Sequence, residues 1–382
     1  MKCKPLKDVA QIIMGQSPDS SSYNEVGEGF PFFQGNADFG VMYPSERIWC
    51  NQPKKIANEN DILISVRAPI GALNYANKKC CIGRGLAAIT VNNPVERNYI
   101  FHLLKAKNAE LNRKGTGSTF KAIGKNVLED IPVPIVSSEI QLHITRLMDI
   151  TESIISKRKN ELKYYDELIK ARFVEMFGNP EVICKDWIEK PLGELCEKVI
   201  RYPTFYGMEY LESGTRVIRI GNILEDGHMD VEDNNYVFVY NGVNNDFPET
   251  VIEINDIIMA VRGDGSAAKR IGIIRENKLV GANISPNLIR IKANHNIDPI
   301  YLFSFLTGEV GQKRLGAYVN KTAKKNIAAK DIVKVFVPTP PIEKQREYAS
   351  FVAQVDKSKV AVQKSLEQTQ MLFDSLLQQY FG

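Results

Sequence analysis

The fold of this chain is decided by residues 335–382, VFVPTPPIEKQREYASFVAQVDKSKVAVQKSLEQTQMLFDSLLQQYFG, because a matching stretch occurs earlier in the sequence. Residues 131–178, IPVPIVSSEIQLHITRLMDITESIISKRKNELKYYDELIKARFVEMFG, align with them without a gap at an offset of 204. Each copy has a proline-containing turn, a long run without Pro or Gly, and an aromatic–Gly end. The pattern predicts a long helix with a glycine C-cap in each half of the chain.

The apolar residues of both predicted helices recur in alternating steps of three and four. Such spacing is typical of the heptad seam of a coiled coil rather than of a broad globular face. We predict that the two seams meet, although two separate helices that each pack on their own domain remain an alternative. The predicted seam residues are Ile155, Leu162, Tyr165, Ile169, Val355, Val362, Leu366 and Phe373.

Length and composition limit the class of protein. A chain of 382 residues is too long for one simple core, so two domains are expected. The net charge of +4 is only mildly basic and alone says little about nucleic acid. The N-terminus lacks the apolar core of a signal peptide and no apolar run approaches a membrane span, so we expect a cytoplasmic protein without a membrane partner. The six cysteines have no C-x-x-C spacing, which favours reduced, mostly buried thiols and no metal site.

A β-rich segment precedes each predicted helix. Residues 61–67 (DILISVR) and 256–262 (DIIMAVR) match as short apolar runs that end in an arginine and a turn, and they predict buried strands. The chain is thus predicted to be a tandem duplication of a mixed α/β unit. Because the β-rich segments differ more than the helices, we expect two different ligands.

The link between the halves is short. Residues 179–188 reach at most about 35 Å, so the second β-rich domain must begin near the end of the first helix. If the seams pair, the helices must then run antiparallel, with a pseudo-twofold axis between the halves. The predicted boundaries are 1–136 for the first domain, 137–178 for the first helix, 179–340 for the second domain and 341–382 for the second helix.

The most basic segment of each half lies just before its helix. Residues 105–125 hold six Lys or Arg and one acid, and residues 312–330 hold six and no acid. Small polar residues among these cations suit a phosphodiester backbone, whereas a merely solvated charged face is the alternative. We favour double-stranded DNA because the feature recurs at the same place in both halves.

Signatures of catalysis are weak. Residues 115–125 do not form a P-loop, and the sequence has no N/D-P-P-Y/F tetrapeptide of the kind found in amino-methyltransferases. No Ser/His/Asp or Cys/His arrangement rises above background. We therefore predict no catalytic residues.

Several motifs together resemble one family, the specificity subunits of type I restriction–modification systems. They are KARFVEMFGNP at 170–180, PTPPIEKQ at 338–345, the two matched strands and the duplicated layout of the whole chain. One departure is Val136-Ser137-Ser138, where the first copy lacks the Pro-Pro doublet. The resemblance implies two β-rich target recognition domains, joined by two long antiparallel coiled-coil helices that hold the halves of a split DNA site at fixed spacing.

The resemblance also implies partners and cofactors. A specificity subunit has no chemistry and no cofactor of its own. It recruits two modification subunits, which methylate adenine with S-adenosylmethionine, and ATP-dependent restriction (motor-nuclease) subunits. Residues off the seam, such as Ile154, Tyr164 and Leu168, would be covered in that assembly.

Candidate DNA contacts follow from matching places in the two halves: strand-end turns, strand-end arginines and pre-helix basic loops. Asn36 and Asn222 could equally be turn residues, and Arg67 and Arg262 could instead pair with a carboxylate. The candidates are Gln34, Asn36, Arg67, Arg113, Lys114, Thr119, Lys121, Asn222, Arg262, Lys321, Lys324 and Lys325.

Two other classes stay open at this point. The chain could be a DNA-binding scaffold, or an accessory fragment of a fused restriction enzyme, outside any type I complex; a hydrolase is a more distant third. Neighbouring genes for a methyltransferase and an ATP-dependent nuclease, or co-purification with a modification subunit, would discriminate between them.

Overall fold

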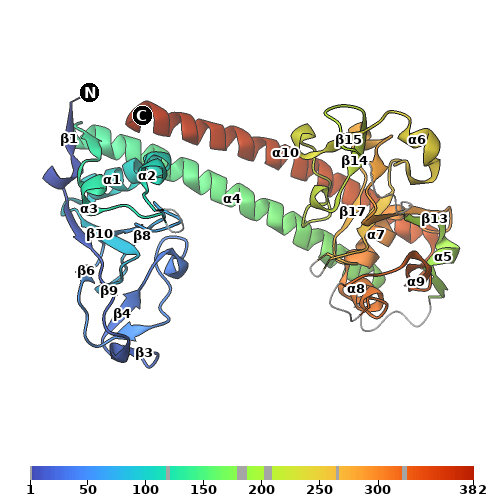
Figure 1. Ribbon diagram of the computed structural model, residues 1–382, viewed down its shortest axis with the longest axis horizontal. Helices are drawn as coiled ribbons and strands as arrows, with labels where there is room; N and C mark the ends of the chain where they lie inside the picture. Colours follow the sequence, from blue (N-terminus) through green and yellow to red (C-terminus); the bar gives the residue numbers. More distant parts are fainter. Residues whose placement is uncertain (1, 118–120, 179–186, 202–208, 264–265, 321–324) are drawn as a thin grey trace. The chain divides into compact units, whose positions relative to one another are not determined.

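The computed structural model describes residues 2–117, 121–178, 187–201, 209–263, 266–320 and 325–382. The chain forms two compact units, Met1–Asn160 with Gln363–Gly382, and Glu161–Val362. The boundary between the units crosses both long helices, α4 (Ser138–Phe177) and α10 (Ile342–Phe381) (Figure 1). Each unit therefore holds one β-rich head and a part of each long helix. We call residues 2–136 the first head and residues 187–340 the second head.

The first head is organised around a four-stranded antiparallel sheet in the order β2-β10-β7-β8. Its central strand β7 (Ile62–Ser65) is buried throughout, which the apolar run of the sequence predicts. A parallel pair, β4 with β9, lies in a second sheet, and β1 with β11 forms a separate ladder. The other strands and helices of this head are β1 (Cys3–Pro5), β2 (Gln11–Met14), β3 (Tyr23–Asn24), β4 (Phe30–Phe33), β5 (Trp49–Cys50), β6 (Ile56–Ala57), β8 (Leu73–Tyr75), β9 (Cys80–Ile82), β10 (Leu86–Thr90), β11 (Pro132–Pro134), α1 (Pro94–Ala106), α2 (Asn108–Lys114) and α3 (Lys125–Glu129).

The second head repeats this plan. Its four-stranded sheet has the order β13-β19-β16-β17, its parallel pair is β14 with β18, and its ladder is β12 with β20. The buried central strand is β16 (Ile257–Ala260). Asn60 and Asn255 both adopt positive φ, of 69° and 67°, just before the matched strands. The remaining elements are β12 (Glu189–Pro191), α5 (Leu192–Leu195), β13 (Cys196–Arg201), β14 (Thr215–Ile218), β15 (Val237–Val239), α6 (Val243–Asp246), β17 (Ile271–Ile273), β18 (Asn283–Ile284), β19 (Leu288–Ala293), α7 (Pro299–Thr307), α8 (Glu309–Gly316), α9 (Ala329–Ile332) and β20 (Phe336–Pro338).

The two long helices contact each other inside each unit, and they run antiparallel. In the first unit, Phe373 and Phe381 from the end of α10 belong to the same apolar core as Ile144 and Met148 from the start of α4. The alternative of two helices that each pack only on their own domain is therefore excluded.

Contacts in the second unit give the same direction. Lys359 Nζ lies 2.6 Å from Asp166 Oδ1, and Arg172 Nη2 lies 3.0 Å from Glu347 Oε1. Between these two contacts the residue number increases along α4 and decreases along α10. The two helices are therefore antiparallel.

Burial along the helices follows the predicted spacing. Ile155, Val355 and Phe373 are buried, whereas their neighbours Ile154, Gln354 and Leu372 are exposed. The other five predicted seam residues are half-buried. The prediction of a mixed α/β fold built as a tandem repeat is confirmed, since a four-stranded sheet, a two-stranded ladder and a sheet with a parallel strand pair recur in both heads. No helix of the described residues is both long and apolar enough to cross a membrane.

Candidate nucleic-acid interface

In the first head, the end of the central strand lies beside the predicted basic loop. Ala68 N donates to Lys121 O at 3.1 Å, and Ile123 N donates to Val66 O at 2.9 Å. Arg67 and Ala122 form an isolated antiparallel bridge between these two bonds. The side chains of Arg67 and Lys121 are exposed. The backbones of two exposed cationic residues that the sequence places far apart therefore lie side by side.

The second head repeats this arrangement. Gly263 N donates to Lys325 O at 3.2 Å, and Ile327 N donates to Val261 O at 3.1 Å. Arg262 and Asn326 form the matching isolated bridge. The side chains of Arg262 and Lys325 are exposed. The strand-end arginine and the loop lysine thus form one feature, present twice.

Gln34 adjoins this feature in the first head. It follows β4, and its carbonyl accepts from Gly85 N at 3.1 Å, while Gly85 O accepts from Val66 N at 2.9 Å. Gly85 is required for this approach, since a Cβ there would lie 2.3 Å from the Gln34 carbonyl oxygen. The exposed side chain of Gln34 therefore starts from the same edge of the head as Arg67.

In the second head, Arg219 occupies the position that Gln34 has in the first. The sequence alone did not predict it as a site residue. It follows β14, and Ser285 N donates to Ile218 O at 2.9 Å, as Gly83 N donates to Phe33 O at 2.8 Å in the first head. Arg219 and Arg262 line one cavity of about 860 Å³, and Asn287, whose carbonyl accepts from Val261 N, lines it too. A count from the end of the strand, rather than from the Gly-Asn dipeptide, would have found Arg219.

Asn222 caps a turn in the second head, which is one of the two roles that the sequence left open for it. Only 2% of it is exposed. Its side-chain carbonyl accepts from Arg219 N at 2.8 Å, and its amide donates to Asn235 O at 3.0 Å. In the first head this capping position belongs to Asp38, which accepts from Gln34 N at 2.7 Å, rather than to Asn36. The alternative that the sequence left open for Asn222 is the one its contacts support.

We call Gln34, Arg67 and Lys121 the polar edge of the first head, and Arg219, Arg262 and Lys325 the polar edge of the second. Both are sets of long hydrogen-bonding side chains on a turn framework that backbone hydrogen bonds hold in place. Donors of this kind can bind phosphate oxygens and base edges.

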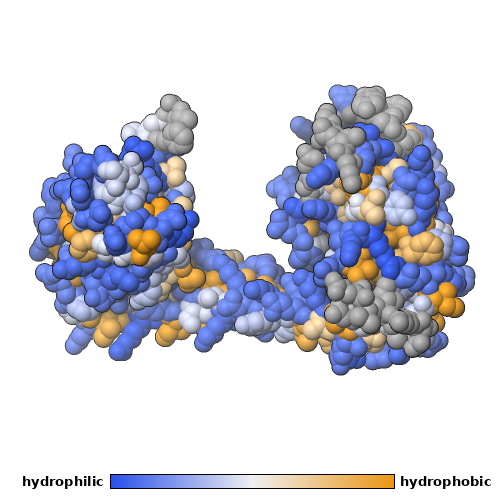
Figure 2. All heavy atoms as spheres, turned by 90° about the horizontal axis from the view of Figure 1, so that it is seen from below, coloured by the Kyte–Doolittle hydropathy of each residue, from blue (hydrophilic) through white to orange (hydrophobic). Residues whose placement is uncertain are grey.

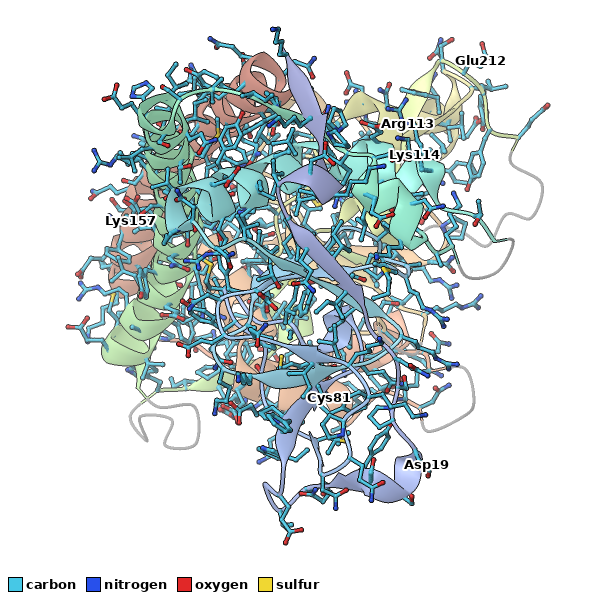
Figure 3. All side chains as sticks on the ribbon, turned by 90° about the vertical axis from the view of Figure 1, so that its left-hand side faces the viewer. Asp19, Cys81, Arg113, Lys114, Lys157 and Glu212 are labelled. Carbon is cyan, nitrogen blue, oxygen red and sulfur yellow. The ribbon has the colours of Figure 1, made fainter. Side chains whose placement is uncertain are left out.

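The remaining candidates of the first head differ in position. Arg113 and Lys114 are exposed at the end of α2, and Figure 3 shows them close together, away from Lys157 on α4. Lys114 pairs with Glu110 at 2.7 Å, and this hydrogen bond lowers the pKa of the Glu110 carboxyl. Asn36 is half-buried. Thr119, Lys321 and Lys324 lie outside the described residues.

The strand-end arginines have no ion-pair partner among the residues that the structure describes. The carboxylates found within 4 Å of an arginine or lysine there belong to other pairs, such as Arg47 with Asp38 and Arg216 with Asp233. An internal ion pair of Arg67 or Arg262 is thus not supported in the described part of the chain. An unpaired guanidinium is suited to an external anion.

One cluster of the first unit has the composition of a metal site. Ligand atoms of His102, Asp149 and Glu152 lie within 4.8 Å of one another. However, Lys105 Nζ lies 2.5 Å from Glu152 Oε1, and an ammonium there would repel a cation. The cluster instead ties α1 to α4 through the hydrogen bond between His102 and Asp149 and the ion pair between Lys105 and Glu152.

Two neighbouring thiols of the first head, Cys80 and Cys81, are buried. Burial raises the pKa of Cys80 to about 12 and that of Cys81 to about 11, so both stay protonated at neutral pH.

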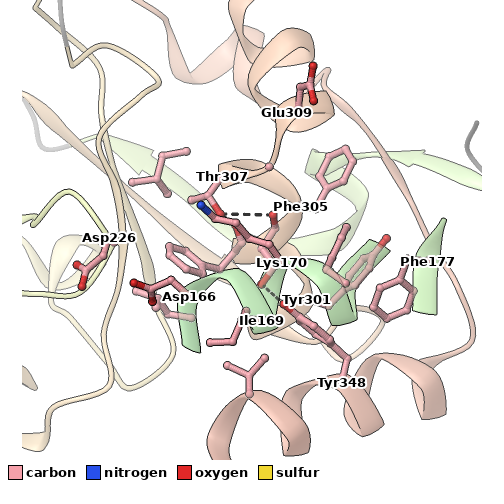
Figure 4. A pocket seen from close by; sticks show the side chains of 18 of the residues that line it. Asp166, Ile169, Lys170, Phe177, Asp226, Tyr301, Phe305, Thr307, Glu309 and Tyr348 are labelled. Atoms are coloured by element: carbon pink, nitrogen blue, oxygen red, sulfur yellow. Dashed lines mark hydrogen bonds between the residues drawn. The ribbon is translucent and has the colours of Figure 1, made fainter. Parts of the chain in front are cut away.

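A second cavity, of about 580 Å³, lies in the second unit where the long helices meet the head (Figure 4). Its wall includes an aromatic cluster in which the rings of Phe177 and Tyr301 are 4.8 Å apart. Its polar groups serve the fold: Tyr301 Oη donates to Pro338 O at 2.9 Å, and Tyr348 Oη bonds Ser304 Oγ at 2.9 Å. We assign this cavity to the packing of the helices on the head.

The helices also carry exposed apolar side chains away from the seam. Tyr164 is 65% exposed, and Ile154 and Leu168 are exposed as well. Figure 2 shows apolar residues in small patches among hydrophilic ones on the visible surface. Single exposed apolar residues are ordinary, whereas a series along one helix is typical of a surface that another protein covers.

Comparison with known proteins identifies the family. A sequence model of the type I restriction modification DNA specificity domain matches residues 1–164 and 184–369. The chain therefore belongs to the family of type I restriction–modification specificity subunits, and carries the domain twice. The resemblance drawn from the sequence is confirmed.

Individual relatives agree with this family. The putative type I restriction enzyme MjaX specificity subunit of Methanocaldococcus jannaschii is 43% identical over 161 residues, which cover 42% of this chain and 38% of that protein. The type I restriction enzyme EcoBI specificity subunit of Escherichia coli is 22% identical over 417 residues, which cover 98% of this chain and 84% of that protein.

A solved structure has the same fold. The crystal structure of the type I restriction-modification system S subunit from M. genitalium matches with a TM-score of 0.60 and 17% identity, over 100% of this chain and 96% of that one. At this identity the likeness concerns the fold alone.

Proposed function

We propose that each head reads one half of a bipartite double-stranded DNA site, and that its polar edge faces the DNA. The observation that carries this proposal is the recurrence of one edge, an arginine at the end of the central strand beside a lysine of the pre-helix loop, in two heads of different sequence. A feature needed only for folding would not require exposed cations at both places. Contacts to phosphates are possible at any DNA sequence, so both heads can use the same arginine and lysine for them. The residues around these cations differ between the heads, which suits two half-sites that differ in sequence.

The partners follow from the family. We propose that α4 and α10 dock two modification subunits, with Ile154, Tyr164 and Leu168 among the covered residues. Restriction subunits would join through that complex. The chain itself would be a non-catalytic recognition subunit in the cytoplasm, where its DNA is, while S-adenosylmethionine and ATP bind the partner subunits.

Co-purification tests the docking. The full chain, expressed with a type I modification subunit from the same genome, should form a complex of two modification subunits per chain by light scattering. Tyr164→Glu with Leu168→Glu should weaken that complex, whereas Lys163→Glu with Glu167→Lys on the same turn should not. A chain that yields no complex with the modification subunit would support the scaffold alternative instead.

A further inference from the structure

We propose that Gln34 and Arg219 occupy one structurally equivalent position in the two heads, and that this position reads one base pair of each half-site. Gln34 would select adenine in the first half-site, and Arg219 would select guanine in the second. This inference rests on the proposed function and names its specificity-determining residues.

The equivalence of the two positions is a matter of backbone geometry. Both residues directly follow a strand that pairs in parallel with a later one: Phe33 pairs with Ile82, and Ile218 pairs with Ile284. Both are followed by a short 3-10 turn. The side chain that ends this turn, Asp38 or Asn222, accepts a hydrogen bond from the backbone N–H of the position itself.

Both 3-10 turns, Asn36–Asp38 and Ile220–Asn222, have three residues, but in the first head Gly35 stands between the strand-end position and the turn, which hides the match in the sequence. Gln34 stands four residues before Asp38, and Arg219 stands three before Asn222. In both heads the cap leaves the backbone of the position fixed and its side chain at the polar edge. A fixed backbone limits where the donors and acceptors of a long side chain can lie, and selective hydrogen bonding to a base edge requires this.

The hydrogen-bonding groups of the two side chains determine which base each one is expected to select. In the major groove, Arg donates two hydrogen bonds to O6 and N7 of guanine, while Gln both accepts from N6 and donates to N7 of adenine. Arg219 Nη2 lies 3.2 Å from Asn235 O, which orients the guanidinium and leaves its other N–H groups to donate. The neighbouring cations Arg67 and Arg262 would hold the phosphates on either side of the reading position.

Reciprocal substitution tests the proposal on the full chain. Duplexes with a random 30-base-pair core are selected by the wild-type chain, by Gln34→Arg and by Arg219→Gln, and the bound pools are sequenced. The first variant should replace adenine by guanine at one position of one half-site. The second should replace guanine by adenine, or lose the preference, at one position of the other half-site, with a change of roughly tenfold to hundredfold in preference. Gln52→Arg and Arg270→Gln are the matched controls; Gln52 is exposed, and Arg270 Nη1 bonds the carbonyl of Ile223 at 3.2 Å.

Each outcome is decisive. A change confined to the predicted single position supports the proposal. An unchanged motif, or a general loss of affinity with a smaller salt dependence and no altered base, would assign Gln34 and Arg219 to the backbone of DNA and overturn it. If the wild-type chain selects no bipartite motif, the proposed function itself fails; an altered motif at Gln52→Arg or Arg270→Gln would overturn the specificity assignment alone.

Discussion

Arg67 forms an isolated antiparallel bridge with Ala122, which brings the end of the central strand of the first head against the basic loop that precedes α4. The same bridge joins Arg262 to Asn326 in the second head. These bridges turn two separate sequence features into one exposed cationic edge per head.

Removing one lysine of the polar edge should lower the affinity for DNA regardless of the DNA sequence. We expect Lys121→Ala or Lys325→Ala to weaken binding to all sequences, and to lower the slope of log K against log salt by about one, because one phosphate contact is lost. Binding titrations between about 50 and 200 mM salt measure this. Lys79→Ala, an exposed lysine just before β9 in the first head, is the control and should leave the slope unchanged. An unaltered slope for Lys121→Ala would remove that residue from the DNA surface.

The pairing of the long helices within the first unit should be visible in stability. Phe373 is 7% exposed and packs in the core of that unit, so Phe373→Ala should lower the free energy of unfolding by about 3 kcal/mol. The adjacent Leu372 is 52% exposed, and its replacement by Ala should change the free energy by about 0.5 kcal/mol or less. Urea unfolding compares the two variants. Equal effects would mean that the seam does not bury Phe373.

Asn222 should behave as a structural residue. Asn222→Ala removes the cap on Arg219 N and the donor to Asn235 O, so we expect a loss of about 1–3 kcal/mol in the free energy of unfolding. The sequence pairs Asn222 with Asn36 of the first head, which is half-buried. Asn36→Ala should lower the free energy of unfolding by only about 0.5 kcal/mol or less. Similar, small effects of both changes would restore Asn222 as a surface residue.

His228 should make the second unit less stable in acid. Burial lowers the pKa of His228 below its ordinary value of 6.5, and the Lys359 ammonium, with Nζ 3.3 Å from Nε2, acts in the same direction. The unfolded chain therefore binds a proton more readily than the folded one as the pH falls. The stability that the neutral ring contributes is present above pH about 6.5 and is lost below it.

His228→Gln should remove this part of the pH dependence, since glutamine does not titrate. Urea unfolding at pH 7.5 and pH 5.5 should show a smaller loss of stability for the variant than for the wild-type chain. A loss of equal size in both proteins would show that His228 is not the group responsible.

The sequence predicted the periodic part of the fold well. The heptad spacing of residues such as Val355 and Phe373 reflects which face of a helix is buried, and that information is local. The strands at 61–67 and 256–262 were visible for the same reason, because an unbroken apolar run needs burial on both faces. The linker length then gave the antiparallel direction, which the contacts within each unit reproduce.

The polar edge could be predicted only in part. Arg67 and Lys121 were both recognisable as exposed cations, but their proximity depends on a bridge between distant segments. Arg219 was missed because the Gly-Asn dipeptide of the second head was matched to that of the first. The first head has one more residue, Gly35, between the strand and the turn, so only the strand pairing of Ile218 and Phe33 reveals which side chains correspond.

The most direct test of the central claim is the sequence that the full chain selects from a pool of random duplexes. The account predicts a bipartite motif: two short specified half-sites separated by a spacer of constant length and free sequence. Replacing Arg67 by Ala should lower the enrichment of that motif without changing the spacer. A single continuous motif, or no enrichment over the starting pool, would contradict the claim that the two heads read the two halves of one DNA site.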